Sequence, residues 1–99
     1  MATLHVLSHS PFSESRLSSC LRLLGPDDGL LLCGDAVYAL QPGSAQCLAL
    51  ELMPASIGLF ALEEDLGARA LAAPARVQVV DYPAFVELSC RFAKVNSWL

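Results

Sequence analysis

The chain has 99 residues, a length that suits one compact domain and leaves little room for two. Hydrophobic residues make up 55% of it and charged residues only 16%, against roughly 45–50% and about 25% in an average soluble domain. This balance excludes intrinsic disorder, which requires the opposite composition. Six Lys and Arg against ten Asp and Glu give a net charge of −4, which argues against direct contact with nucleic acid. We therefore expect a single globular domain, residues 1–99, with apolar surface left to cover.

Four short apolar runs have the length and the flanking turn residues of β-strands. They are residues 3–7, 30–33, 57–61 and 77–80. The second and third runs are almost continuously apolar rather than alternating. That pattern is typical of parallel strands covered on both faces of their sheet.

Segments with helical periodicity or helix-start residues follow each of these runs. They are residues 13–24, 44–53, 63–71 and the segment after Asp81, in which Phe85, Leu88 and Phe92 share one face. The alternation predicts a small three-layer α/β fold with a mostly parallel sheet of four to five strands, of the flavodoxin-like kind.

Cysteine usage and hydropathy bear on the compartment. Cys20, Cys33, Cys47 and Cys90 form no C-x-x-C pair, and each lies in an apolar stretch, as packed thiols in a reducing cytosol do. The first ten residues lack a signal-peptide pattern, and the apolar runs are far shorter than a membrane helix. We expect a cytoplasmic protein without membrane contact, bound metal or cofactor.

The usual catalytic and metal-binding patterns are missing or weak. The sequence has neither a glycine-rich phosphate loop nor a G-x-S-x-G motif. His5 and His9 are four residues apart, but one lies in a predicted strand and the other in the loop after it, so a structural role is favoured over metal binding. The acidic run 63–65 suits the exposed start of a helix better than an acid–base pair.

Cys20 has two interpretations. It shares a helical stripe with Leu17 and Leu21, which indicates a small core residue. It is also flanked by polar residues, among them Arg22, and a nearby cation lowers the pKa of a thiol and favours the nucleophilic thiolate. Both interpretations stay open at this point.

Asp35 and Trp98 are the other candidates. Asp35 follows the second predicted strand, at the edge of a parallel sheet where ligands bind, or it caps the short turn 36–40. In the first case the chain would be a flavodoxin-like module for a small ligand. Trp98 is a large aromatic residue near the end of the sequence, and we expect it to pack on its own domain or on a partner.

Several stretches, in order, resemble the TusB/DsrH family of sulfur-relay proteins. The resemblance lies in Ser10-Pro11-Phe12, Ser19-Cys20-Leu21, the run Leu30 to Tyr38 with Asp35, the run Ala61 to Leu71, the run Val80 to Val86, and Trp98. It covers nearly the whole sequence, and its specificity lies in the set rather than in any one motif.

The resemblance implies a fold of the DsrE/DsrF/DsrH type and assembly with two homologous subunits, of TusC/DsrF and TusD/DsrE type, into a heterohexamer. Such a complex passes persulfide sulfur toward the 2-thio group of the wobble uridine in tRNA, and this chain would have mainly a structural role in it. The alternative is a DsrH-type subunit that carries sulfur on Cys20 in dissimilatory sulfur oxidation. Cys20 matches a cysteine position of DsrH-type members, whereas Cys33, Cys47 and Cys90 are expected to be packing residues.

Overall fold

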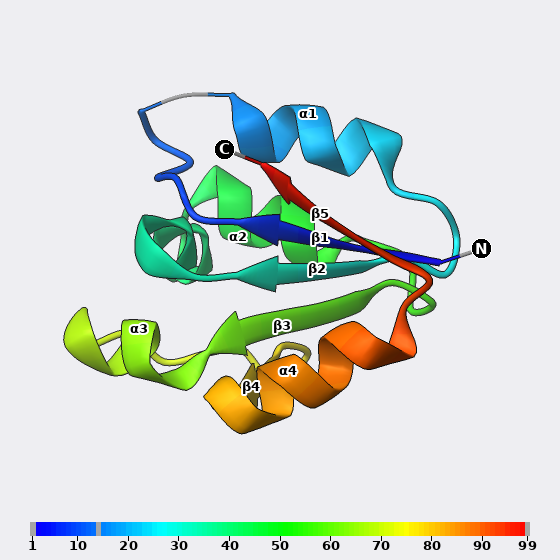
Figure 1. Cartoon of the computed structure of the whole chain (residues 1–99). Helices are drawn as coiled ribbons and strands as arrows, with labels where there is room; N and C mark the ends of the chain where they lie inside the picture. Colours follow the sequence, from blue (N-terminus) through cyan, green and yellow to red (C-terminus); the bar gives the residue numbers. More distant parts are fainter. Residues whose placement is uncertain (1, 14, 99) are drawn as a thin grey trace.

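The structure is a computed structural model that describes residues 2–13 and 15–98. Its strands form one parallel sheet in the order β4-β3-β2-β1-β5, with helices on both sides (Figure 1). The strands are β1 (Thr3–Leu7), β2 (Gly29–Leu32), β3 (Gly58–Leu62), β4 (Gln78–Val80) and β5 (Lys94–Trp98). The helices are α1 (Arg16–Leu23), the 3-10 helix η1 (Gly34–Leu40), α2 (Ala45–Glu51), α3 (Glu63–Ala68) and α4 (Tyr82–Arg91). Within these ranges, no helix has the length and apolar character that a membrane crossing requires.

The order of the strands fixes the side on which each helix lies. From β1 to β4 the chain moves across the sheet in one direction, and it then returns to place β5 beside β1. When crossovers are right-handed, the helices that connect strands in one direction across the sheet lie on one face, and a helix that connects strands in the return direction lies on the opposite face. Accordingly, Leu17 of α1 and Leu50 of α2 belong to one apolar cluster, while Leu88 of α4 belongs to another (Figure 1).

Strand β2 lies at the centre of both clusters. All four of its residues are buried. Leu30 and Leu32 join the cluster under α1 and α2, and Leu31 joins the cluster under α4. The continuous apolar run thus belongs to a parallel strand covered on both faces, as predicted.

Local capping explains where two of the helices begin. The Ser44 side chain accepts a hydrogen bond from the backbone N–H of Cys47 at 3.1 Å, at the start of α2. The Asp81 carboxylate accepts one from the N–H of Ala84 at 2.8 Å, and Pro83 lies in the first turn of α4, where its missing N–H does no harm.

The α/β class and the parallel sheet are confirmed, and the element boundaries differ in detail. The four predicted strands are present with shifts of one residue at most. The predicted helix 63–71 ends earlier, at Ala68, because Ala70 takes a positive φ of 52°, outside the helical range. Helix α1 begins at Arg16, and residue 14 of the predicted segment lies outside the described residues.

The sheet has five strands, within the predicted four to five, but no run of residues had been assigned to the fifth. The first four residues of β5 are exposed, so the strand has no apolar alternation to reveal it. It nevertheless pairs with β1 over five residues, from Thr3 opposite Lys94 to Leu7 opposite Trp98. An edge strand held mainly by its backbone leaves little trace in hydropathy.

Candidate functional site

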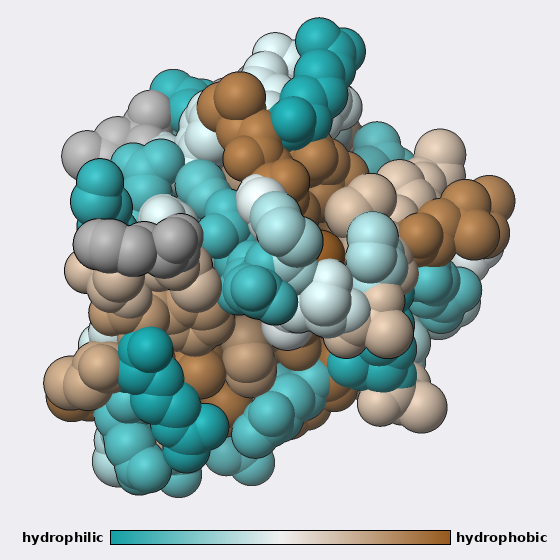
Figure 2. Space-filling model, turned by 90° about the vertical axis from the view of Figure 1, so that its right-hand side faces the viewer, coloured by the Kyte–Doolittle hydropathy of each residue, from teal (hydrophilic) through white to brown (hydrophobic). Residues whose placement is uncertain are grey.

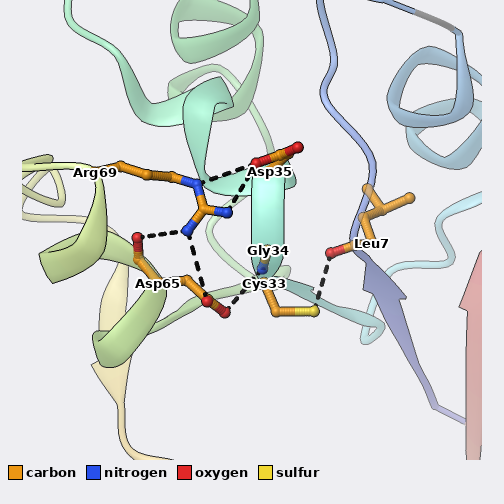
Figure 3. A network of polar contacts seen from close by, with 6 residues as sticks. All are labelled: Leu7, Cys33, Gly34, Asp35, Asp65 and Arg69. Atoms are coloured by element: carbon orange, nitrogen blue, oxygen red, sulfur yellow. Dashed lines mark hydrogen bonds and ion pairs between the residues drawn. The ribbon is translucent and has the colours of Figure 1, made fainter.

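The carboxyl ends of the strands bring together Asp35, one of the residues singled out from the sequence, and Cys33. In an open parallel sheet, the loops at this edge commonly form binding sites. Here the loops after β1, β2 and β3 meet, and a polar network joins them (Figure 3). Asp35 lies in this network, as the sequence predicted.

Asp35 is bound by an arginine from a neighbouring helix. The guanidinium of Arg69, at the end of α3, donates to Asp35 Oδ1 from Nη2 at 2.8 Å and from Nε at 3.2 Å (Figure 3). The same guanidinium lies 5.6 Å from the centre of the Tyr38 ring. Asp35 therefore ties η1 to α3. The alternative that Asp35 caps the turn 36–40 is wrong, because Asp35 lies inside η1, whose start has no side-chain cap hydrogen bond. The ligand contact stays a prediction.

Asp65 completes the connection between β2 and α3. Its Oδ2 accepts a hydrogen bond of 2.8 Å from the N–H of Gly34, and its Oδ1 lies 3.6 Å from Nη1 of Arg69. Gly34 has a positive φ of 51°, and a Cβ there would lie 3.1 Å from the carbonyl oxygen of Ser8. The loop after β2 is thus fixed by backbone conformation as well as by charge.

Cys33 is the thiol at this edge. It is half-buried, and its Sγ donates to the carbonyl of Leu7 at 3.4 Å (Figure 3). Burial raises the pKa of the Cys33 thiol, and the negative charge of Asp65 raises it further. The neutral thiol is therefore the favoured form at this position.

Cys20 lies on the buried face of α1, in the core. Its exposed fraction is 0%. Burial raises the pKa of the Cys20 thiol to about 12, and the negative charge of Asp28 adds to that effect. Of the two interpretations left open, the geometry favours the core residue: the pKa shift is opposite to the one that a nearby cation would cause, and the thiolate is strongly disfavoured in this conformation.

His5 and Trp98 form a buried chain of hydrogen bonds with Asp28. The indole N–H of Trp98 donates to His5 Nδ1 at 3.1 Å, and His5 Nε2 lies 3.3 Å from Asp28 Oδ2. Because the indole nitrogen is a donor only, His5 Nδ1 must accept, and the imidazole proton belongs on Nε2, facing Asp28. The structural role expected for His5 and the packing of Trp98 on its own domain both agree with this geometry.

Asp28 also holds two backbone amides. It accepts from the N–H of Thr3 at 2.9 Å and from the N–H of Gly25 at 2.8 Å. Burial alone would raise the pKa of the Asp28 carboxyl, but the hydrogen bonds from Gly25, Thr3 and His5 lower it below its ordinary value. Asp28 is thus a structural anion that connects β1 with the turn before β2.

The two remaining cysteines, Cys47 and Cys90, differ in their exposure to solvent. Cys47 is buried, and burial raises the pKa of its thiol, with a further contribution from Glu51. Cys90 is exposed, which corrects the expectation that it packs inside; α4 covers the sheet with a different face. Among the residues that the structure describes, no three His, Cys, Asp or Glu side chains gather as metal ligands.

Three charged residues that hold loops and helix ends together in the structure were not predicted from the sequence. They are Asp28, Arg69 and Arg76. The spacing of Asp65 and Arg69, one helical turn apart, was a signal for the pair. Asp28 lies in a stretch rich in turn residues, and its distant partners left no local signal.

The chain was compared with known proteins. A family model described as "DsrH like protein" matches residues 9–95. Protein TusB of Erwinia tasmaniensis is 43% identical over 97 residues, which cover 96% of this chain and 99% of that protein. Protein TusB of Escherichia coli is 36% identical over 97 residues with the same coverage. The crystal structure of the ychN protein from E. coli aligns with a TM-score of 0.80 over 99% of this chain and 100% of that one, and at 19% identity this likeness concerns the fold alone.

Proposed function

The chain belongs to the DsrH-like family, and from this membership we propose that it is a subunit of a sulfur-relay complex. The complex passes persulfide sulfur toward 2-thiolation of the wobble uridine of tRNA. The observation that carries the proposal is the 43% identity to a Protein TusB along almost the full length of both chains. Its partners are the homologous subunits of TusC/DsrF and TusD/DsrE type, in a cytoplasmic heterohexamer.

The charge of the chain supports a role away from the tRNA. With six cations against ten anions, the subunit repels a phosphate backbone more than it attracts one. Among residues 2–13 and 15–98, eight large hydrophobic side chains are exposed, including Leu52 at 73% and Leu23 at 66%. Apolar patches between hydrophilic residues also appear on the face at the amino ends of the strands (Figure 2). Such surface suits a subunit that is covered by its partners.

The geometry of the thiols supports a mainly structural role. Sulfur transfer by a cysteine needs a reachable thiol with thiolate character. Cys20 has neither, since it is fully buried with a pKa near 12. The half-buried Cys33 has a raised thiol pKa as well. Because neither Cys20, the cysteine that the resemblance singles out, nor Cys33 at the carboxyl edge meets these requirements, we assign the sulfur-carrying cysteine to a partner subunit; Cys90 is exposed but matches no cysteine position named for the family.

Assembly tests the proposal directly. The chain is co-expressed with its two homologues, and the mass of the purified species is measured by native mass spectrometry and light scattering. We expect one complex with two copies of each subunit. A chain that elutes alone at every tested concentration would rule out the proposed function.

A second experiment tests sulfur transfer through Cys20. In that reaction the Cys20 thiolate attacks the outer sulfur of a donor persulfide, the donor S–S bond breaks, and the donor leaves as a thiolate. Cys20 would gain about 32 Da as a persulfide. Under conditions that load the partner subunit, we expect no such gain on Cys20. A gain that disappears in Cys20→Ser would establish the chain as a carrier and would show that α1 opens.

A further inference from the structure

The side chain of β5 that packs inward is that of its last residue, Trp98. The strand lies at the border of the sheet beside β1, and its first four residues are exposed (Figure 1). Trp98 packs against the apolar cluster that contains Leu17 of α1, and its indole N–H donates to His5 Nδ1 at 3.1 Å. The attachment of Trp98 therefore depends on an acceptor at Nδ1 of His5.

The neutral imidazole satisfies both of its neighbours, and the imidazolium does not. The neutral ring donates from Nε2 to Asp28 Oδ2, 3.3 Å away, and accepts from Trp98 at Nδ1. In the imidazolium both nitrogens carry a proton, so two N–H groups would face each other at Nδ1. The indole gives no compensation as an aromatic face, because it presents its positively polarised N–H edge to His5. A proton on His5 therefore breaks the hydrogen bond with Trp98.

Asp28 favours the protonated ring. His5 and Asp28 are both buried, with exposed fractions of 6% and 8%. A proton on His5 converts their hydrogen bond into one between opposite charges, which is shorter and stronger than a neutral one. The same proton thus strengthens the contact of His5 with Asp28 and removes its contact with Trp98.

The groups around His5 keep their charge between pH 5 and pH 8, the interval in which histidine ordinarily titrates. The pKa of the Asp28 carboxyl is held below 3.8, and the pKa of the Cys20 thiol on α1 is about 12. Leu30 of β2 and Asn96 of β5, which are opposite His5 in the sheet, do not titrate. The basic residues of α1 and β5 are not among the buried residues of these elements; they are Arg16, Arg22 and Lys94.

We propose that His5 is a pH-dependent switch for the end of β5: the neutral imidazole holds Trp98, and the imidazolium, held by Asp28, releases it. The released state binds the proton more tightly than the docked state does, so acid shifts the population toward release. Release uncovers the backbone of β1 at Leu7, the residue paired with Trp98. This inference does not depend on the proposed sulfur relay, and its failure would leave that proposal standing.

The composition of the chain makes a direct test possible. Trp98 is the one tryptophan, so the indole N–H gives a single NMR signal, and the exposed His9 is the one other histidine. The readout is the protection factor of the indole N–H, which compares its hydrogen-exchange rate with that of an unstructured indole at the same pH. In the full chain we expect this factor to fall about 2- to 10-fold from pH 8 to pH 5, the equivalent of one lost hydrogen bond.

Two glutamine variants give the matched comparison. His5→Gln has an amide that accepts and donates but gains no proton, so its protection factor should be the same at both pH values. His9→Gln should follow the wild type. The backbone amides of β2, at the centre of the sheet, report any global opening in each protein. A wild-type protection factor that stays constant, or one that falls equally in His5→Gln, would overturn the switch.

The reciprocal measurement does not require the His5 variant. Trp98→Phe keeps an aromatic ring but removes the indole N–H, so the ring of His5 should take up its proton at a pH higher by about 0.3–1 unit than in the wild type. The NMR signal of the imidazole Cε1–H follows this step, and the signal of His9 should not move between the two proteins. An unchanged His5 titration in Trp98→Phe would contradict the switch even if His5→Gln does not fold.

Discussion

Gly29 lies at the start of β2, in the closest packing between the sheet and α4. A Cβ at this position would lie 2.6 Å from Cζ of Phe92 and 3.1 Å from a methyl carbon of Leu4. We predict that Gly29→Ala lowers the free energy of unfolding by about 1–3 kcal/mol, the usual cost of overpacking a core. Urea denaturation measures it. Gly67→Ala is the matched control, because nothing lies within 4 Å of its added Cβ; an equal loss in both would contradict the packing argument.

Residue types predicted packing better than they predicted chemistry. The apolar stripe of α1 placed Cys20 in the core, whereas its polar neighbours suggested a reactive thiol. Cys20 is fully buried, and burial raises the pKa of its thiol; the charge that adds to this shift comes from Asp28, eight positions further along the chain. A pKa depends on groups brought close by the fold, and a single sequence does not place those groups.

Arg76 is the residue that holds the end of α2 and the loop after it. Its guanidinium donates to the carbonyls of Glu51 and Ile57 at 3.2 Å each, and also to those of Met53 and Pro54. They belong to the end of α2 and the loop after it, where carbonyls run out of intrahelical partners; the carbonyl of Pro54 also accepts the N–H of Ile57 at 3.0 Å. One side chain therefore fixes the segment that leads from α2 into β3.

We predict that Arg76→Met lowers the free energy of unfolding by about 2–4 kcal/mol, since hydrogen bonds from a charged group contribute about 1.5–3 kcal/mol. Thermal and urea unfolding give the value. Arg91→Met serves as the control: Arg91 makes an exposed ion pair with Glu87 at 3.3 Å, and such pairs contribute less than about 1 kcal/mol. If Arg76→Met lowers the free energy of unfolding no more than Arg91→Met does, the loop after α2 is stable without the hydrogen bonds of Arg76.

Elements with apolar faces were predictable, and elements held by the backbone were not. Strands β1 to β4 and the four α-helices follow from periodicity and capping residues such as Asp81. The residues of β5 were not predicted as a strand, because the pairing of β5 with β1 relies on main-chain hydrogen bonds and on Trp98 at its end. In the network at the carboxyl edge, the position of Asp35 was predicted, and the spacing of Asp65 and Arg69 was a signal for their pair. The contact between Arg69 and Asp35 was not predictable, since Arg69 reaches Asp35 from 34 residues away.

On the scale of the whole molecule, the surplus of apolar residues serves two purposes. Part of it builds the two clusters on either side of β2. The rest is exposed, and at Leu48 and Leu52 it lies in the stretch 36–62, in which Glu51 is the single charged residue. Composition thus indicated that the domain would expose apolar surface, and the fold shows where that surface lies.

The chain of Trp98, His5 and Asp28 makes the stability of the whole fold sensitive to acid. It joins the last strand to the first, and Asp28 joins both to the turn before β2. The folded state holds the pKa of the Asp28 carboxyl below its ordinary value of 3.8. The unfolded chain therefore binds a proton more readily, so the stabilisation is complete above 3.8 and is lost as the pH falls through the folded pKa.

We predict that the urea midpoint of the wild-type protein falls between pH 6 and pH 3, and that Asp28→Asn, already less stable at pH 6, loses less over the same interval. Asn keeps one acceptor oxygen, which serves the amide of Thr3 or that of Gly25 but not both, because these amides bind different oxygens of Asp28. Asn also has no proton to gain, so its curve lacks the titration of Asp28. Asp27→Asn, at the exposed neighbouring position, should follow the wild-type slope. Parallel curves for wild type and Asp28→Asn would mean that other carboxylates set the acid limit, and that the connection from β5 through β1 to the turn before β2 does not depend on the Asp28 charge.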